Sequence, residues 1–250
     1  MRVVLALTSI GGTLAVGSQH LTGGGGAGPS AIAPSDNVVF HRRLAAIDAR
    51  VAEIVDLRAD FEQKRYTPLL QRPLVSNGTV MAAGDRMRWD TTSPSPSSML
   101  VGRTAVELYY PEDHLIEVYP VDRGFMDLAG VPMPRLSILS KRFDISRLNP
   151  LDMDPTCDGD RYLAIELVPR AEDLRNYVTA VQMLIDGSRA IATIVVMTGP
   201  DGDRTEIVFS NTQLNTGLVE DRLVLDVPEG VRRVQPLSDI KDQSPQRDRR

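Results

Sequence analysis

The densest group of side chains able to hold a cation is an acidic run of four aspartates around one glycine: Asp152, Asp154, Asp158, Gly159 and Asp160. Calcium loops of the EF-hand type close the site with a glutamate at the twelfth position. In a loop that starts at Asp154, Ile165 occupies that position and Glu166 follows one residue late. We therefore interpret the run as an acidic turn before a strand, and the sequence predicts neither a metal site nor a cofactor.

Candidates for nucleophilic or acid–base catalysis are few and scattered along the chain. Cys157 is the single cysteine, which excludes a disulfide within the chain and a cysteine-based metal cluster. His20, His41 and His114 are far apart in sequence and form no pair with metal-ligand spacing. The sequence also lacks a Gly-x-Ser-x-Gly elbow, a P-loop and a dinucleotide fingerprint. We interpret Cys157 as a loop or core residue and expect a protein that is not an enzyme.

The charge balance argues against nucleic acid as a partner. The 250-residue chain carries a formal net charge of -5, and its isoelectric point is about 5.3. Nucleic-acid binding relies on clustered Lys and Arg, and base stacking needs aromatic side chains, which make up 5% of the residues. The hydrophobic fraction of 42% and the charged fraction of 24% are ordinary for a soluble globular protein.

The first residues have the pattern of an export signal. Arg2 supplies a positive charge, and the mostly apolar stretch 3–16 next to it is too short to span a bilayer. The tripeptide Ala15-Val16-Gly17 suits cleavage before Ser18. We therefore expect residues 1–18 to be a signal peptide, and the mature protein to be soluble in the compartment to which it is exported.

Composition also divides the rest of the chain. Residues 19–34 are rich in glycine and are expected to form a flexible linker. Residues 238–250 are polar and charged without apolar periodicity, and are expected to be disordered. The folded domain is predicted to span residues 35–237.

A helix is predicted at the start of this domain. Its apolar residues recur every three or four positions, as one stripe of an α-helix does: Phe40, Leu44, Ile47, Val51 and Ile54. Ser35 or Asp36 is suited to cap its first turn. The charged residues fall away from the stripe, so this amphipathic helix must pack on an apolar surface.

Short strands separated by turn residues make up most of the domain after this helix. Alternation predicts strands over residues 57–66, 79–82, 86–92, 97–101, 105–110, 115–119, 161–168, 177–185, 190–197, 205–210 and 222–227. Asn77-Gly78, Asp186-Gly187 and Asp201-Gly202 are predicted as turns. The spacing of Leu136, Leu139 and Phe143 predicts a short helix in the middle. This order predicts an α+β fold, a large curved antiparallel sheet with helices covering its concave face.

Two of the predicted strands are apolar at nearly every position, the segments 177–185 and 190–197. A strand with one solvated face shows clean alternation instead. Both faces of these strands therefore need cover. One interpretation is a core on one side and a helix on the other, and the other is a core on one side and a lipid cavity on the other.

Several short motifs occur along the chain in a recognisable order. After the first helix come Ala59-Asp60-Phe61-Glu62-Gln63, Arg86-Met87-Arg88-Trp89, Ser98-Met99-Leu100-Val101, Leu108-Tyr109-Tyr110-Pro111, the run 205–211 and Val227-Pro228-Glu229-Gly230-Val231. Together they resemble the outer-membrane lipoprotein carrier family, the LolA-like proteins, over about residues 44–231. The resemblance implies an unclosed β-barrel with a helical lid and a periplasmic location. It also implies that acyl chains of lipoproteins or other lipids are carried in a cavity between sheet and helices.

One position departs from the family pattern. Counted back from Trp89, the Arg-Pro pair of the family falls on Ala83-Gly84. The resemblance implies that this arginine contacts the lid and couples lid closure to transfer of the cargo. Ala83 cannot donate such hydrogen bonds, so Arg86 and Arg88 are the candidate lid contacts. The insert 69–74 resembles a divergent branch of the family.

The predicted lining of the cavity consists of ten apolar residues: Phe61, Val80, Trp89, Leu100, Leu108, Met183, Ile185, Ile194, Val196 and Phe209. Plain core packing is the alternative for each, and a register slip by one residue would turn it to the other face. The leading hypothesis is a monomeric carrier that takes acyl chains from an inner-membrane transporter to an outer-membrane acceptor. The alternative is an envelope-sensing or protein-interaction module that uses the same fold without lipid transport.

Overall fold

Strand β1 (Asp56–Tyr66) shows how the sequence builds the sheet. Leu57, Ala59 and Phe61 are buried, whereas Arg58 and Glu62 are exposed. Successive side chains of a strand point to opposite faces, so one face of β1 is apolar and the other is polar. The computed structural model, which describes residues 34–120 and 132–236, confirms the alternation predicted for this segment.

Strand β1 lies in the middle of one sheet that contains all twelve strands of the described residues. Their order is β12-β6-β5-β4-β3-β2-β1-β11-β10-β9-β8-β7. The other strands are β2 (Leu74–Ala83), β3 (Arg86–Ser93), β4 (Ser97–Val101), β5 (Ala105–Tyr110), β6 (Leu115–Pro120), β7 (Phe143–Leu148), β8 (Tyr162–Pro169), β9 (Ala180–Asp186), β10 (Ile191–Thr198), β11 (Arg204–Leu214) and β12 (Arg232–Val234). Neighbouring strands are antiparallel, except that β12 runs parallel to β6.

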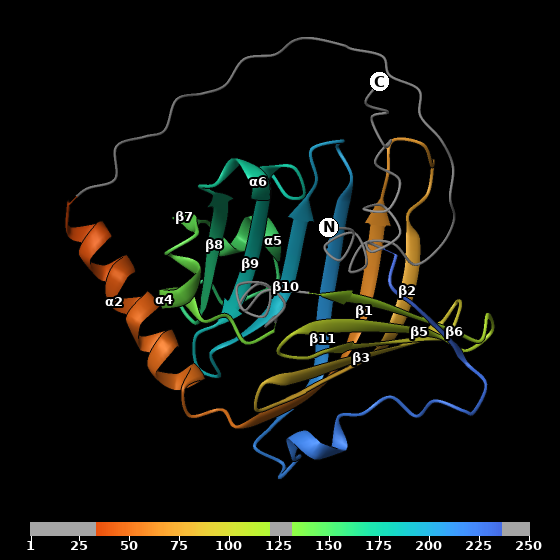
Figure 1. Cartoon of the computed structure of the whole chain (residues 1–250). Coiled ribbons are helices and arrows are strands. Elements are labelled where there is room, and N and C mark those ends of the chain that lie inside the picture. The colour runs from red at the N-terminus through yellow and green to blue at the C-terminus, as the bar shows by residue number, and fades with distance from the viewer. Residues whose placement is uncertain (1–33, 121–131, 237–250) are drawn as a thin grey trace, which may run out of the picture.

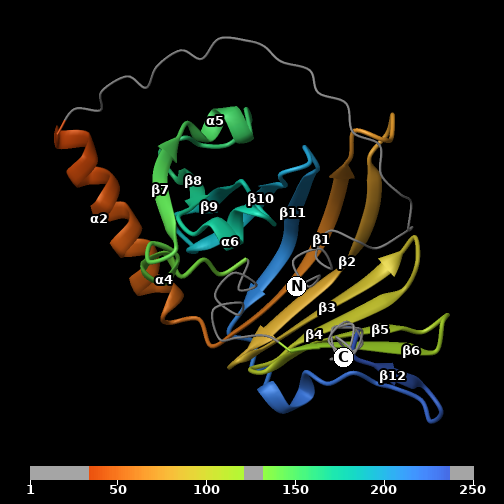
Figure 2. The same ribbon diagram turned by 45° about the horizontal axis from the view of Figure 1, so that its top comes forward.

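The chain forms two successive meanders that meet where β1 pairs with β11. Strands β1 to β6 follow one another outward across the sheet, and β7 then begins at the opposite edge. From there β8 to β11 return toward β1, so the last long strand closes the gap beside the first. The sheet curves strongly, and its edge strands β7 and β12 lie far apart (Figures 1 and 2). The predicted fold class, a large curved and unclosed sheet with few helices, is therefore confirmed.

Two helices pack on the concave side of the sheet, next to the β7 edge. Helix α2 (Pro34–Val51) buries Phe40, Ile47 and Val51, and the short helix α4 (Leu136–Leu139) buries both of its end residues. These side chains join the same apolar cluster as the buried residues of β1. The predicted stripe is thus confirmed, although the helix begins at Pro34 and includes Ser35 and Asp36 rather than being capped by them.

Helix α2 lies beside the β7 edge (Figure 2), and polar contacts fasten it to neighbouring elements. Arg43 donates hydrogen bonds of 2.9 Å to the carbonyl oxygens of Asp160 and Tyr162. Asp48 accepts a hydrogen bond of 2.7 Å from the backbone N–H of Ser137, where α4 begins. The charged side of the helix therefore holds it in place, while its apolar side fills the concave space.

Three of the predicted segments are placed differently by the structure. Asn77-Gly78 is not a turn but lies inside β2, where the pairing with β3 shifts by one residue. A Cβ at position 78 would overlap the carbonyl oxygen of Asp90 and lie 2.9 Å from the ring of Phe61. The glycine therefore reflects close approach of backbone and ring rather than a reversal of the chain.

The other two differences lie in the second half of the chain. The predicted helix stops at Leu139, and Phe143 opens strand β7 instead of completing the helix. The predicted strand over residues 222–227 is a 3₁₀ turn, η1 (Glu220–Arg222), followed by irregular chain. Two short helices, α5 (Pro150–Met153) and α6 (Glu172–Arg175), occur where none was predicted.

Some predictions concern residues that the structure does not describe. The signal peptide of residues 1–18, the linker of residues 19–34 and the tail of residues 238–250 all lie outside the described ranges, apart from the first residue of α2. These assignments remain predictions.

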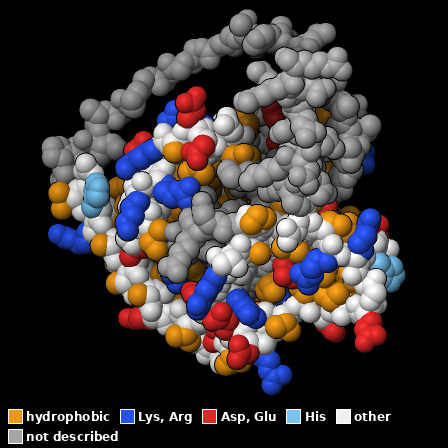
Figure 3. Space-filling view, viewed as in Figure 1, with side chains coloured by type: hydrophobic (Ala, Val, Ile, Leu, Met, Phe, Trp, Pro, Cys, Tyr) orange, Lys and Arg blue, Asp and Glu red, His pale blue; other side chains and the backbone are white. Residues whose placement is uncertain are grey.

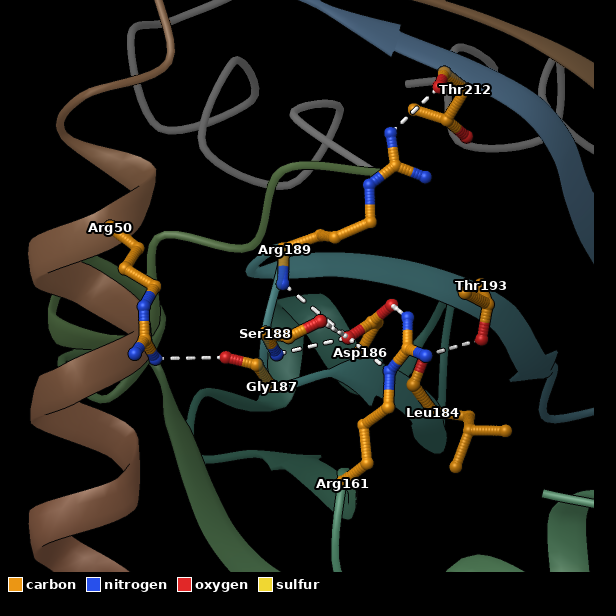
Figure 4. Close-up of polar contacts among 9 residues, drawn as sticks. All are labelled: Arg50, Arg161, Leu184, Asp186, Gly187, Ser188, Arg189, Thr193 and Thr212. Carbon is orange, nitrogen blue, oxygen red and sulfur yellow. Dashed lines mark hydrogen bonds and ion pairs between the residues drawn. The ribbon is translucent and has the colours of Figure 1, made fainter. Parts of the chain in front are cut away.

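The turn between β9 and β10 is held by one buried carboxylate (Figure 4). Asp186 is 2% exposed and accepts hydrogen bonds from the guanidinium of Arg161 and from the backbone and hydroxyl of Ser188. Burial alone would raise the pKa of Asp186, but these donors outweigh it and lower the pKa to about 2. Arg50 of α2 donates to the carbonyl oxygen of Gly187 at 2.9 Å, which ties the helix to the same turn.

Candidate functional site

The concave face of the sheet is apolar across most of its width. Residues opposite one another on antiparallel strands share a face, and the register places Phe61 opposite Phe209 and Val80 opposite Trp89. Seven of the ten predicted lining residues are on this face: Phe61, Val80, Trp89, Leu108, Met183, Ile185 and Phe209. All seven are buried in one cluster.

The other three predicted lining residues lie on the convex face. Leu100 is opposite Arg88 and Glu107, and Val196 is opposite Gln182 and Glu206. Ile194 is two residues from Val196 on β10, so it points to the same face, and it lies opposite Val208. The prediction was wrong for these residues because β4 and β10 are apolar on both faces, so their sequences do not distinguish the two sides.

Sequence reasoning missed other members of the concave lining. They are found by tracing the strand pairing outward from β1: Leu57, Ala59, Met99, Val101, Val106, Leu163, Ile165, Leu167, Val181, Val195 and Ile207. The alternation of β1 was recognised in the sequence and could have identified the N-terminal members. Residues that pair with the buried residues of β1 lie on the same face, and the same holds for each further strand.

Three aromatic rings meet at the centre of this face. The ring centroids of Phe61 and Trp89 are 5.0 Å apart, and those of Trp89 and Phe209 are 5.8 Å apart. Gly78 lies opposite Phe61 and provides the space for its ring. The indole N–H of Trp89 donates to the sulfur of Met87 at 2.9 Å. The centre therefore presents rings and a thioether, which are suited to contact with hydrocarbon rather than with ions.

A small polar patch interrupts the apolar face beside these rings. It consists of Gln63, Ser76, Thr91 and Ser97, which lie on four neighbouring strands and are 6–9% exposed. Gln63 is opposite Ser76, and Thr91 is opposite Ser97. All four lie on the side of the aromatic rings that faces the β1–β2 turn. The concave face is thus apolar in its middle and polar at this end.

The two arginines predicted as lid contacts lie on the convex face. Arg86 donates to the carbonyl oxygen of Leu223 at 3.3 Å, and Arg88 donates to that of Val224. Leu223 is 1% exposed, so the segment after η1 is packed under strands β3 to β5 (Figure 1). Both arginines therefore hold the C-terminal segment instead of a helix on the concave side.

The position of the family Arg-Pro pair is the turn between β2 and β3. Ala83 ends β2 and is buried, and Gly84 has a positive φ of 56°. A Cβ on Gly84 would overlap a carboxylate oxygen of Glu220. The β2–β3 turn therefore packs closely against Glu220 of η1, and neither Ala83 nor Gly84 contributes a polar side chain to the concave face.

A hollow of about 470 Å³ opens on the convex side near the β4–β5 turn. Its lining is Arg86, Leu100, Gly102, Arg103, Thr104, Ala105, Glu107 and Glu220. The charges are paired, since Arg86 lies 3.6 Å from Glu220 and Glu107 lies 2.9 Å from Arg233. The lining mixes apolar residues with two arginines and two glutamates, so this hollow differs in character from the apolar concave face.

The acidic run lies in the loop between α5 and β8. Asp154 accepts hydrogen bonds from the backbone and hydroxyl of Thr156, and these donors lower its pKa. Burial raises the pKa of the Cys157 thiol, and the nearby Asp154 and Asp158 raise it further. A thiol of raised pKa is a poor nucleophile. Among the described residues, no group of three or more His, Cys, Asp or Glu could hold a metal ion.

The surface carries no field of one sign on the side drawn in Figure 3. Over the described part of that side, basic and acidic side chains alternate with apolar ones. Within the described ranges, no helix has the length and apolarity needed to cross a bilayer.

No protein-family model matches the sequence, and neither does any curated protein. Similar solved structures include an uncharacterised conserved protein from Thermus thermophilus, with 12% identity, a TM-score of 0.48 and coverage of 79% of this chain and 99% of that one. A LolA superfamily protein from Nitrosomonas europaea has 11% identity and a TM-score of 0.40, and the match covers 74% of this chain and 97% of that one. The Pseudomonas aeruginosa MucA/MucB complex has 12% identity, a TM-score of 0.38 and coverage of 76% and 61%. At these values the functions of those proteins do not transfer to this chain.

Proposed function

We propose that this protein binds acyl chains of lipoproteins or other lipids on the concave face of its sheet and carries them between envelope membranes. The observation that supports the proposal is the continuous apolar lining around Phe61, Trp89 and Phe209, on the inner side of a sheet that does not close. Burial of a chain stabilises a complex by about 0.8 kcal/mol per methylene. Acyl chains in contact with these side chains would therefore be held without covalent chemistry.

Two adjacent strands offer a matched pair of variants to test the location of the chain. Leu108 on β5 lies on the concave face, and Leu100 on β4 lies on the convex face. We expect Leu108→Gln to weaken uptake of a fluorescent acyl probe at least about tenfold, because it places an amide among the chain contacts. Leu100→Gln is expected to leave uptake within about twofold of the wild type.

Native mass spectrometry of the protein purified from its own envelope gives a second measurement. A bound mass that corresponds to lipid supports the proposal, and the same mass should be lost from the Leu108→Gln variant. If only unbound mass is recovered and the purified protein takes up no acyl probe, the proposal is wrong.

The route of the cargo is part of the proposal. We propose that residues 1–18 direct export to the periplasm, where the mature monomer receives its lipid from an inner-membrane transporter and delivers it to an outer-membrane acceptor. N-terminal sequencing of the protein recovered from the envelope fraction tests this step. A mature chain that begins near Ser18 is expected, and an intact N-terminus in a cytoplasmic fraction contradicts export.

The second candidate is a module that senses the envelope or binds another protein. The exposed end of the β1–β2 hairpin favours it, since Leu69 is 79% exposed and Leu70 is 47% exposed. Exposed apolar side chains of this kind often mark an interaction surface. Capture of one stable regulatory partner that is lost in Leu69→Ser/Leu70→Ser, with no lipid bound, would favour this function over carriage.

A further inference from the structure

The polar patch on the concave face has an unusual property: its residues are 6–9% exposed, and their side chains make no hydrogen bond within the described part of the protein, while their polar atoms still reach solvent. Gln63 is 9% exposed and Ser76 is 6% exposed. Polar side chains inside a core nearly always have a partner within the protein, whereas the polar atoms of this patch remain accessible to water or to a ligand. The same is true of Thr91 and Ser97, both 7% exposed. The patch therefore offers accessible polar atoms that no other described residue occupies, which is suited to contact with a polar ligand.

A neighbouring arginine provides an independent observation. Arg65 has the same parity on β1 as Gln63, and its Nε is fully buried with no hydrogen-bond partner. One of its terminal nitrogens donates to Asp203 at 2.7 Å, so the side chain is held in place while Nε–H remains unused. The end of the concave face thus combines an amide and hydroxyl groups with a neighbouring arginine whose Nε–H is buried and has no partner.

The apolar rings lie directly beside this polar group. Phe61 and Gln63 are two positions apart on one face of β1, which places them about 7 Å from each other along the strand. An amphiphile whose chain contacts Phe61 and Trp89 would therefore bring its head to Gln63 and Thr91. We propose that this patch binds the head of the carried lipid and selects an uncharged head that is rich in oxygen acceptors, such as esters and hydroxyls.

The charge of the patch favours an uncharged head over a carboxylate or phosphate. The positive charge of Arg65 is already compensated by Asp203, and Gln63, Ser76, Thr91 and Ser97 are neutral. An anionic head would lose its hydration without gaining a free counter-charge. Ester and hydroxyl oxygens cost less to desolvate, and they satisfy the unused donors. This inference rests on the proposed function, because it assumes that the chain lies on the concave face.

The contributions of head and chain to binding can be distinguished with three ligands that share one medium-length chain: a monoacylglycerol, the matching fatty acid and the matching hydrocarbon. Each is measured by displacement of a fluorescent acyl probe from the full-length protein. We expect the wild type to bind the monoacylglycerol at least about tenfold more tightly than either of the others. In Gln63→Leu/Thr91→Val this preference should fall by about tenfold, while binding of the hydrocarbon is unchanged or tighter. Thr79→Val is the matched control, since Thr79 is on the convex face of β2 and is half-buried.

Thermal unfolding of the ligand-free variants distinguishes a binding role from a structural one. Because the replaced groups have no partners, Gln63→Leu/Thr91→Val should unfold at the wild-type temperature or above it. If the double variant is less stable and has also lost binding of all three ligands, the patch has a structural role and the inference is overturned. If the wild type binds all three ligands equally well, the inference is wrong but the proposed function stands. If it binds none of the three, the proposed function is wrong as well.

Discussion

At the scale of single residues, the fold depends on polar groups placed where the chain reverses. Asp186 receives two donors from Arg161 and two from Ser188, and this set joins the ends of β8, β9 and β10 (Figure 4). A buried carboxylate of this kind is costly to leave without donors, and the donors are costly to leave without the carboxylate. The residue is therefore a structural anchor, although it resembles a catalytic carboxylate in its burial and its lowered pKa.

Asp186 also predicts how stability depends on pH. Its pKa is about 2 in the folded protein, compared with an ordinary value near 3.8. The depressed pKa contributes up to about 2 kcal/mol above pH 4, and this contribution is lost as the pH falls toward 2. In urea titrations, Asp186→Asn is expected to be less stable than the wild type at pH 7, and the difference should shrink between pH 4 and pH 2. A difference that is independent of pH would contradict this role.

Gly78 gives a second test at this scale, because it lies inside a strand and faces the ring of Phe61. Gly78→Ala should destabilise the protein by about 1–3 kcal/mol, since the added carbon overlaps the carbonyl oxygen of Asp90. The fluorescence of Trp89 should change as well, because its ring packs on Phe61. Gly159→Ala is the control, since no atom lies within 4 Å of its added carbon. Equal stability of the two variants would show that β2 has room at position 78.

At the scale of elements, the features that could be predicted from the sequence depend on how each strand is covered. Strand β1 has one polar face, so its alternation reveals which side is buried. Strand β10 is apolar on both faces, and its inward side becomes known only from its pairing with β11. The helical spacing of α2 was likewise readable, because one side of that helix is solvated.

Other elements could not be predicted because their local sequence is compatible with two different structures. Asn77-Gly78 is a strong turn signal, yet here the glycine accommodates the ring of Phe61 on the neighbouring strand β1. Phe143 continues the helical spacing of α4 but opens β7, where it lies opposite Pro169 of β8. The residues of the polar patch are individually ordinary, and only the register brings Gln63 and Ser76 together. Tertiary context decides in each case.

The segment after η1 is an element whose stability can be tested separately. Leu223 is its buried anchor on the convex face, where Arg86 donates to its carbonyl oxygen. Leu223→Ala should increase hydrogen exchange of the amides in residues 219–231 and cost about 2 kcal/mol, the lower end for a buried leucine. Val224→Ala is the control, since Val224 is 47% exposed. Unchanged exchange in Leu223→Ala would mean that the arginines alone hold the segment.

At the scale of the whole molecule, the two meanders form one sheet and share one apolar cluster. Trp89, the single tryptophan, reports on the first meander, and Cys157, the single cysteine, reports on the second. We expect tryptophan fluorescence and thiol labelling to follow the same unfolding transition in denaturant, because loss of the β1–β11 pairing exposes both halves. Two separate midpoints would show that the meanders are independent folding units.

The same pairing has a consequence for biosynthesis. Strand β1 leaves the ribosome before nine other strands are made, and β11, which must lie beside it, follows all nine of them. Until then β1 to β6 and β7 to β10 can pair only among themselves, so the β1 edge is unpaired and Phe61 lacks Phe209 opposite it. Unpaired edges and uncovered apolar surfaces favour aggregation. A protein with this strand order is therefore most exposed to aggregation during the interval between synthesis of β1 and synthesis of β11.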